Sequence, residues 1–199
     1  MAKVLYQGHG SMRFTTDTGT VVYVDPYAGE GYDLPADLIL VTHQHYDHNV
    51  IDLPARAEGC VVWQNMDSHP TPNAWLIKTF GDVTVEAVQA SNIKHPINEC
   101  VGYLLRMDGL LIYCAGDTSL TEQMRELATR GIDYAFLPGD GIYNMDVAGA
   151  AHCAEVIGAK HNVPIHLKPG ELYGEAEAER FATLAPNALL IRAGEEVDL

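Results

Sequence analysis

Short hydrophobic stretches separated by turn residues occupy the first 116 residues of the chain. β-branched and aromatic residues fill these stretches, and glycine-containing turns such as MDG at 107–109 stand between them. This arrangement is typical of β-strands joined by tight turns. The pattern therefore predicts strands at 3–8, 12–16, 20–25, 36–43, 60–64, 74–79, 83–90, 101–107 and 110–116.

Beyond residue 116 the pattern alternates between helices and strands. Apolar residues recur at helical spacing in 119–131, where Ser119 precedes Glu122 by three residues, the spacing of a capping box. Asp146 is the predicted N-cap of a second helix at 146–160. The remaining segments predict strands at 133–139, 163–167 and 188–193 and a helix at 174–185.

The order of these elements predicts an α/β (α+β) fold. A strand-rich first part followed by alternating helices and strands is explained by two packed sheets with helices on the outside. No linker rich in Pro, Gly or Ser divides the chain, so we expect one domain over residues 1–199.

Composition limits the partners that we expect. The chain has 12 Lys and Arg against 27 Asp and Glu, a net charge of −15 that would repel nucleic acids and membrane surfaces. A small-molecule substrate is the expected partner. The four cysteines are dispersed without a metal or disulfide spacing, and neither a signal peptide nor a membrane-length apolar run is visible, so we expect a cytoplasmic protein.

The sequence THQHYDHN at 42–49 concentrates three of the nine histidines around one aspartate. In an extended chain His43, His45 and Asp47 would project to one side, and a turn would bring His48 back to them. Imidazole nitrogens and carboxylate oxygens are the ligands that Zn²⁺ and similar metals prefer. The cluster therefore predicts one bound metal ion and leaves room for two.

Two residues elsewhere repeat the pattern of a ligand directly after an apolar strand. Asp117 follows the predicted strand 110–116, and a carboxylate there can bridge two metals that lie about 3.5–4 Å apart. His166 lies near the end of the strand 163–167. We expect both side chains to join the histidine cluster.

These motifs carry a family resemblance. THQHYDH, AGDTS and VPIHL, in this order, resemble the metallo-β-lactamase-fold hydrolases. The opening YQGHGSMRF, with VDPY and ADLILVTH, looks most like small metal-dependent hydrolases near the ascorbate-phosphate lactonase-like branch. The resemblance covers nearly the whole chain and implies a four-layer αβ/βα sandwich with the metals at one edge between the two sheets.

The resemblance also implies a ligand set. One metal would be held by His43 and His45, a second by Asp47, His48 and His166, and Asp117 would bridge them.

The first metal in such proteins usually takes a third histidine, and here the sequence departs from that pattern. Asn92 stands near the expected position and His95 follows three residues later. Three possibilities remain open: His95 supplies the ligand, Asn92 coordinates weakly, or the protein holds one metal. His9 is expected either beside the site as a hydrogen-bonding group or as a structural turn residue. The other histidines are expected on the surface or on helices: His69, His152 and His161.

The implied activity is hydrolysis of an ester, a lactone or a phosphodiester by a metal-bound hydroxide. Asp47 and Asp117 would be the catalytic carboxylates, positioning the metals and accepting the proton of water. Two Zn²⁺ per chain are expected, with Mn²⁺, Fe²⁺ or Ni²⁺ as alternatives. His45 favours the zinc type, because diiron members usually carry glutamate there. The competing hypotheses are a mononuclear iron or other metal-dependent oxygen or redox protein on the same fold and a non-catalytic metal-binding protein.

Overall fold

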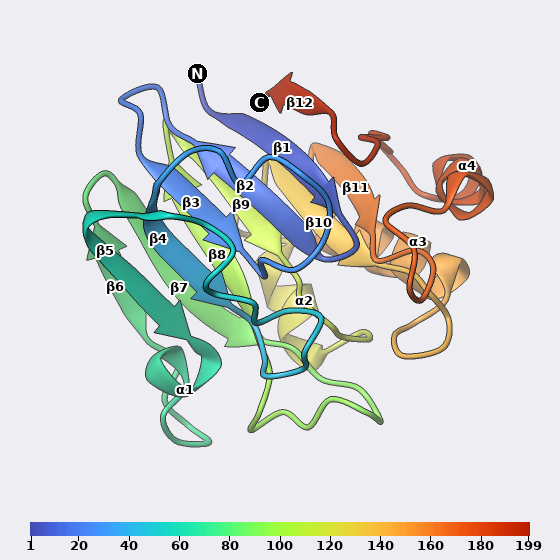
Figure 1. The fold of residues 1–199 in the computed structure, drawn as a ribbon. Coiled ribbons are helices and arrows are strands. Elements are labelled where there is room, and N and C mark those ends of the chain that lie inside the picture. Colours follow the sequence, from blue (N-terminus) through green and yellow to red (C-terminus); the bar gives the residue numbers. More distant parts are fainter.

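Two six-stranded β-sheets pack face to face in the computed structural model, which describes residues 1–199 (Figure 1). The strand order is β12-β1-β2-β3-β4-β5 in the first sheet and β11-β10-β9-β8-β7-β6 in the second. Both sheets are mixed: β3, β4 and β5 run parallel to one another, as do β9, β10 and β11, while the other pairs are antiparallel. The predicted α/β sandwich is confirmed.

The elements have the following bounds. The first sheet contains β1 Lys3–Gly8, β2 Ser11–Thr15, β3 Val21–Val24, β4 Ala36–Val41, β5 Arg56–Gln64 and β12 Glu196–Asp198. The second contains β6 Ile77–Phe80, β7 Val83–Gln89, β8 Val101–Met107, β9 Leu110–Cys114, β10 Tyr134–Pro138 and β11 His161–Ile165. The helices are α1 Asn65–Ser68, α2 Glu122–Leu127, α3 Val147–Ile157 and α4 Glu175–Leu184.

The main core lies between the sheets. Phe14 of β2 and Phe136 of β10 meet edge to face across the two sheets, with ring centroids 5.7 Å apart. The outer face of the second sheet packs against α2, α3 and α4, which contribute buried residues such as Met124 and Phe181. On the outer face of the first sheet, Tyr23 stacks on Tyr32. No helix of the structure is both long enough and apolar enough to cross a membrane.

The prediction of a strand at 188–193 is wrong. This segment makes only an isolated bridge from Ala188 to Asn162, although Ile191 is buried in the core. The last strand is instead β12, which pairs with β1. An apolar run in a sequence indicates that the segment is buried but not that it is a strand. This segment is buried without the hydrogen bonds of a sheet.

The predicted helix at 119–131 is shorter than expected, and its predicted capping box is wrong. The helix begins after Thr121, because the backbone N–H of Ser119 donates to Ser91 O at 2.9 Å and holds the preceding segment outside the helix. Asp146, by contrast, caps α3 as predicted and accepts a hydrogen bond from the backbone N–H of Gly149.

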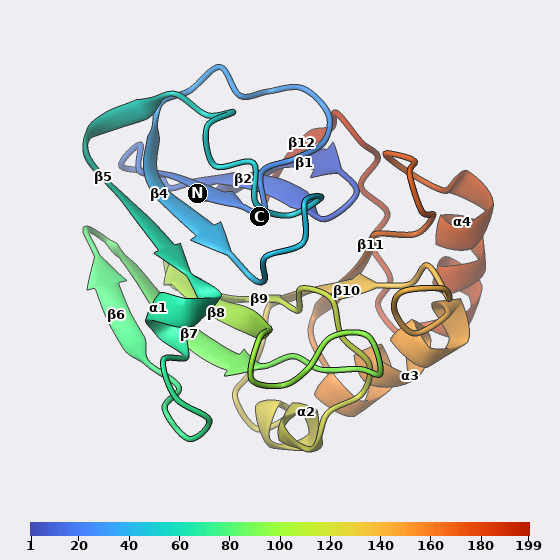
Figure 2. The ribbon, with the colours of Figure 1, turned by 60° about the horizontal axis from the view of Figure 1, so that its bottom comes forward.

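The predicted site residues follow the ends of strands and lie at one edge of the sandwich. This edge is turned towards the viewer in Figure 2. β4 ends directly before the histidine cluster at 42–49, β9 ends before Asp117, and β11 ends before His166. The turn between β1 and β2 carries His9 to the same edge, where the backbone N–H of His166 donates to His9 O at 2.8 Å. The fold therefore brings together residues that are far apart in the sequence.

Asp133, remote from this edge, gives a prediction for the stability of the fold. Its carboxylate accepts hydrogen bonds from Lys160 Nζ at 2.7 Å and from the backbone N–H of Leu111 at 2.8 Å. Burial alone would raise the pKa of Asp133, but these two donors hold it below its usual value. Because the folded-state pKa is lowered, the stabilisation is present at neutral pH and is lost as the pH falls through that pKa.

Asp133→Asn is therefore expected to lower the free energy of unfolding by about 1–2 kcal/mol at neutral pH. The difference in unfolding free energy between the variant and the wild type should shrink below about pH 4, because the carboxyl of the unfolded state becomes protonated there. Urea unfolding over this pH range measures it. Asp52→Asn is the control, since Asp52 is 90% exposed in its pair with Arg56. A loss that does not depend on pH would show that the charge is not responsible.

Candidate metal centre

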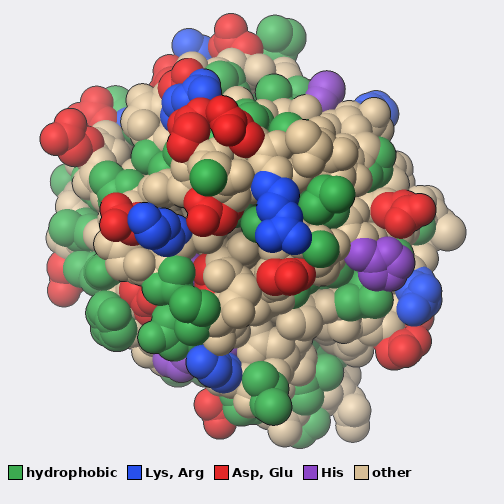
Figure 3. All heavy atoms as spheres, turned by 90° about the vertical axis from the view of Figure 1, so that its right-hand side faces the viewer, with side chains coloured by type: hydrophobic (Ala, Val, Ile, Leu, Met, Phe, Trp, Pro, Cys, Tyr) green, Lys and Arg blue, Asp and Glu red, His purple; other side chains and the backbone are tan.

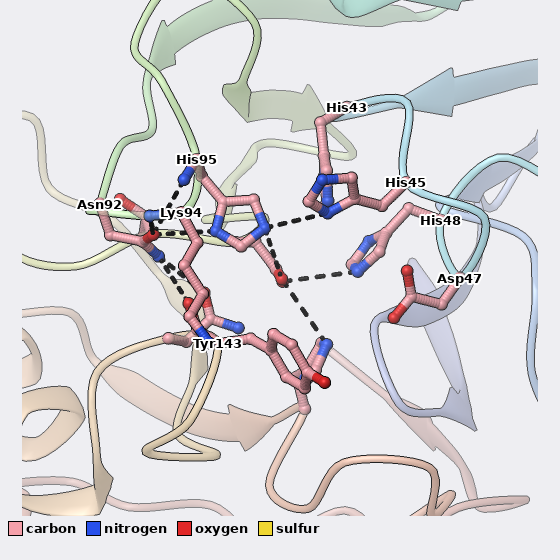
Figure 4. A network of polar contacts seen from close by, with 12 residues as sticks. His43, His45, Asp47, His48, Asn92, Lys94, His95 and Tyr143 are labelled. Carbon is pink, nitrogen blue, oxygen red and sulfur yellow. Dashed lines mark hydrogen bonds and ion pairs between the residues drawn. The ribbon is translucent and has the colours of Figure 1, made fainter.

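The seven residues predicted as ligands converge at this edge (Figure 4). His43, His45 and His95 form one group of candidate ligands. Nε2 of His95 lies 3.2 Å from Nδ1 of His45 and 3.3 Å from Oδ2 of Asp117. His95, rather than Asn92, thus occupies the place where the sequence left the third ligand open.

A second group lies on the other side of Asp117. It consists of Asp47, His48 and His166, and His9 joins them. Nε2 of His48 lies 3.5 Å from Oδ1 of Asp117, and Nε2 of His166 lies 3.7 Å from Oδ2. The carboxylate of Asp117 therefore faces both groups, as a bridging ligand would.

Backbone geometry helps to place Asp117. Gly116, directly before it, has a φ of +62°. A Cβ at this position would lie 2.9 Å from Thr42 Cβ and 2.9 Å from Val101 O. The close approach of the two sheets at the site thus requires glycine here.

Asp25, at the end of β3, orients two of the histidines. Its buried carboxylate accepts from the backbone N–H of Thr42 at 2.7 Å, from the Thr42 hydroxyl at 2.6 Å and from Nδ1 of His48 at 2.8 Å. Because the Thr42 hydroxyl donates to Asp25, its oxygen is free to accept from Nδ1 of His43 at 3.0 Å. Both histidines then carry their proton on Nδ1 and leave Nε2 available as a ligand.

Asn92 orients His95 in the same manner. Its Oδ1 accepts from the backbone N–H groups of Lys94 and His95, which identifies it as the oxygen. The same atom lies 2.9 Å from Nδ1 of His95, so Nδ1 is the donor and Nε2 is the free nitrogen. Asn92 is thus a positioning residue for the ligand that follows it three residues later.

His166 is held by an unusual backbone and by a carboxylate. Its φ is +46°, in the left-handed region, and its Nδ1 lies 3.2 Å from Oδ2 of Asp140. Burial alone would raise the pKa of Asp140, but His166 and the backbone N–H groups of Tyr143 and Ile142 hold it well below its usual range. An ionised carboxylate therefore stands behind His166 on the side away from Asp117.

His9 is buried beside Asp47. Its Nε2 lies 3.2 Å from Asp47 Oδ2, and its backbone adopts a φ of +54°. Burial alone would raise the pKa of Asp47, but the hydrogen bond from His9 and the nearby His48 hold it well below its usual range. The first of the two roles expected for His9, a hydrogen-bonding group beside the site, matches this placement.

Burial and neighbouring charges shift the pKa of three ligand candidates, His43, His48 and Asp117. Burial and the neighbouring His48 hold the pKa of His43 far below its ordinary value, so His43 is a neutral donor. Burial alone would lower the pKa of His48, but Asp117 and Asp25 raise it to about 9. Burial would raise the pKa of Asp117, but His48 and His166 lower it to about 2.

The donor set fits a metal. Buried Nε2 atoms of His43, His48 and His166 have no hydrogen-bond partner, although buried polar atoms in proteins are nearly always paired. Ligand atoms that lie about 2.0–2.1 Å from a tetrahedral Zn²⁺ are roughly 3.3 Å apart. The separations of His95 Nε2 from His45 Nδ1 and Asp117 Oδ2, 3.2 Å and 3.3 Å, match this spacing.

The sequence reasoning missed two carboxylates of the site and misplaced one histidine. Asp25 and Asp140 each follow a buried strand, which is the signal that identified Asp117, and it was not applied to them. His69, expected on the surface or on a helix, is buried after α1 and stacks on Trp75 with ring centroids 3.8 Å apart. His152 and His161 are exposed, as predicted.

Asn92→Ala is expected to weaken metal binding about 10–100-fold, because the ring of His95 loses the acceptor that fixes its orientation. Asn92→Asp keeps an oxygen facing Nδ1 and should restore most of the affinity. Competition with a chromophoric chelator measures both variants. If the aspartate variant binds as weakly as the alanine variant, Asn92 acts through its bonds to Tyr143 and Asn144 instead.

Comparison with known proteins identifies the family of the chain. Residues 3–166 match the family model described as beta-lactamase superfamily domain. A UPF0173 metal-dependent hydrolase of Geobacillus sp. (strain WCH70) is 30% identical over 99% of this chain and 100% of its own length. A candidate metal-dependent hydrolase from Parabacteroides distasonis superposes with a TM-score of 0.77 at 27% identity, covering 96% of this chain and 93% of that one.

A more distant structure shares the fold. CmlA from Streptomyces venezuelae, a diiron β-hydroxylase, superposes with a TM-score of 0.70 at 13% identity, covering 100% of this chain and 54% of its own. Two mixed sheets with a histidine and aspartate centre at their shared edge define a protein of the metallo-β-lactamase fold. The chain belongs to the beta-lactamase superfamily and, within it, to the UPF0173 metal-dependent hydrolases.

Proposed function

We propose that this protein is a dinuclear, zinc-type hydrolase that cleaves a small ester, lactone or phosphodiester. The observation that carries the proposal is the position of Asp117. Its two oxygens face His95 on one side and His48 and His166 on the other, at 3.3–3.7 Å. A carboxylate between two groups of bare imidazole nitrogens is suited to hold two metals close together.

When bound, such a metal pair lowers the pKa of water and polarises a carbonyl or phosphoryl oxygen. The side chains of this protein do the positioning. Asp25 and Asn92 fix the rings of His48 and His95, Asp140 lies 3.2 Å from Nδ1 of His166, and the pair of Asp47 and His9 faces the same cavity. That cavity, of about 280 Å³, also includes Asp117 in its wall. It is large enough for a small substrate.

Charge supports a small molecule as the partner rather than a nucleic acid or a membrane. The net charge is −15. On the face shown in Figure 3, basic side chains are separated by acidic and hydrophobic ones, and no continuous basic area forms. A polyanion would find little electrostatic attraction on this face.

A substrate panel tests the proposal. Untagged protein reconstituted with Zn²⁺ is assayed against a 4-nitrophenyl ester, a lactone and bis(4-nitrophenyl) phosphate, with and without prior removal of metal by a chelator. We expect turnover of at least one class, loss after chelation, and recovery on adding Zn²⁺. Fully loaded protein that hydrolyses none of the three would favour the non-catalytic hypothesis. Activity that survives chelation would contradict a metal-dependent reaction.

A further inference from the structure

Lys94 stands beside the metal centre without a carboxylate partner. It directly precedes His95, and its ammonium lies 4.4 Å from the centroid of the Tyr143 ring (Figure 4). None of the ion pairs of the structure involves Lys94 or Lys78, whereas Lys3, Lys160 and Lys168 are each paired with a carboxylate. In a chain with 27 acidic residues, an unpaired ammonium at this place is a free binding group.

The position of this ammonium is built into the fold. The side chain of Asn92 accepts from the backbone N–H of Lys94 at 2.8 Å and donates to Tyr143 O at 3.1 Å, which ties the two loops together. The carboxylate of Asp140 accepts from the backbone N–H of Tyr143 at 2.6 Å and fixes the second loop. The aromatic face attracts the cation and keeps it beside the centre.

Two cavities meet at this place. Lys94 lines one of about 450 Å³ together with His43 and His45. Tyr143 lines the cavity of about 280 Å³ that contains Asp117, and His45 belongs to the walls of both. Lys94 thus shares a cavity wall with two of the histidines that would hold the first metal, and its ammonium lies over a residue in the wall of the neighbouring cavity. The one acidic side chain in the wall of the larger cavity is Glu99, which is exposed.

We propose that Lys94, held over Tyr143, binds an oxyanion of the substrate, so that the preferred substrates carry a carboxylate or a phosphate group close to the bond that is cleaved. This inference rests on the proposed hydrolase function and narrows its substrate class. A single ammonium binds either anion through charge-assisted hydrogen bonds. A substrate with a cation at the same place would be repelled.

A matched pair of esters tests the inference. 4-Nitrophenyl hydrogen succinate carries a carboxylate that 4-nitrophenyl acetate lacks, and both release the same product. Lys94→Gln should raise the KM of the succinate ester about tenfold, the loss of one charge-assisted hydrogen bond, and change that of the acetate ester less than about twofold. Lys94→Arg should keep most of the preference. Equal losses on both esters, or no loss on either, would overturn the inference.

Lys78→Gln is the matched control, because Lys78 also lies near an aromatic ring, 5.1 Å from the Phe80 centroid, but on β6 outside both cavities. It should leave both KM values unchanged. Thermal unfolding of each variant verifies that the fold is intact.

Calorimetric binding to the metal-loaded protein separates the subsite from catalysis. We expect Lys94→Gln to bind succinate or inorganic phosphate about tenfold more weakly than the wild type, and the tighter-binding anion of the two identifies the substrate group. If no ester is hydrolysed but this difference is found, the anion subsite stands and the proposed function fails. If esters are hydrolysed but Lys94→Gln changes neither binding nor KM, the inference fails and the proposed function stands.

Discussion

Replacing Asp117 with alanine is expected to lower kcat/KM for hydrolysis by about 1,000-fold, which corresponds to about 4 kcal/mol of transition-state stabilisation. The reason is that its carboxylate faces both groups of histidines, with its oxygens 3.3 Å from His95 Nε2 and 3.5 Å from His48 Nε2. The variant should also retain fewer metal ions per chain. Steady-state kinetics and elemental analysis of the same preparation measure the two effects together.

Two controls accompany the Asp117 variant. Asp52→Ala removes a carboxylate that is exposed in its pair with Arg56 and should change neither quantity. Asp117→Asn keeps the size of the side chain but halves its coordinating oxygens, so its activity should also fall steeply. Wild-type activity in Asp117→Ala would contradict the bridging role, whatever the metal content.

Replacing Asp25 with asparagine is expected to destabilise the protein by about 3 kcal/mol and to weaken metal binding about 10–100-fold. The buried carboxylate accepts three hydrogen bonds, two from Thr42 and one from His48, and an amide of the same shape cannot accept all of them. Nδ1 of His48 then loses its acceptor, and its Nε2 is no longer held towards Asp117. Urea unfolding in the presence of a chelator isolates the stability effect from the effect of bound metal.

Asp37→Asn is the matched control for Asp25→Asn. Asp37 lies on the same sheet, and its exposed carboxylate accepts one hydrogen bond, from the backbone N–H of Val21. We expect a loss below about 1 kcal/mol and unchanged metal affinity. An Asp25→Asn protein that matches the wild type in both stability and metal affinity would show that Asp25 does not orient His48.

Much of the fold could be predicted, because short strands and a capped helix leave local signals. The hairpin at 107–109, the cap at Asp146 and the run into the histidine cluster each depend on neighbouring residues only. The segment 188–193 was mispredicted because its burial depends on packing against distant strands. The predicted helix begins too early, because the backbone N–H of Ser119 donates to Ser91 O instead of joining α2, and Ser91 is far away in the sequence.

The residues of the candidate site also fall into those that the sequence predicts and those whose roles depend on contacts in the folded chain. Six of the seven ligand candidates are visible in the sequence, since each follows an apolar strand or lies in the dense histidine motif. The choice between Asn92 and His95 could not be made from the sequence, because it depends on a turn in which Asn92 Oδ1 accepts two backbone N–H groups. The role of His9 depends on a left-handed turn that brings it against Asp47, which lies 38 residues later in the chain.

The metal content of native, untagged protein tests the central claim most directly, and inductively coupled plasma mass spectrometry measures it. We predict about two equivalents of zinc per chain, the number that two ligand groups sharing Asp117 would hold. About one equivalent of iron would instead favour the oxygen-chemistry hypothesis. Protein that binds no metal, even after reconstitution, would contradict the proposed dinuclear centre.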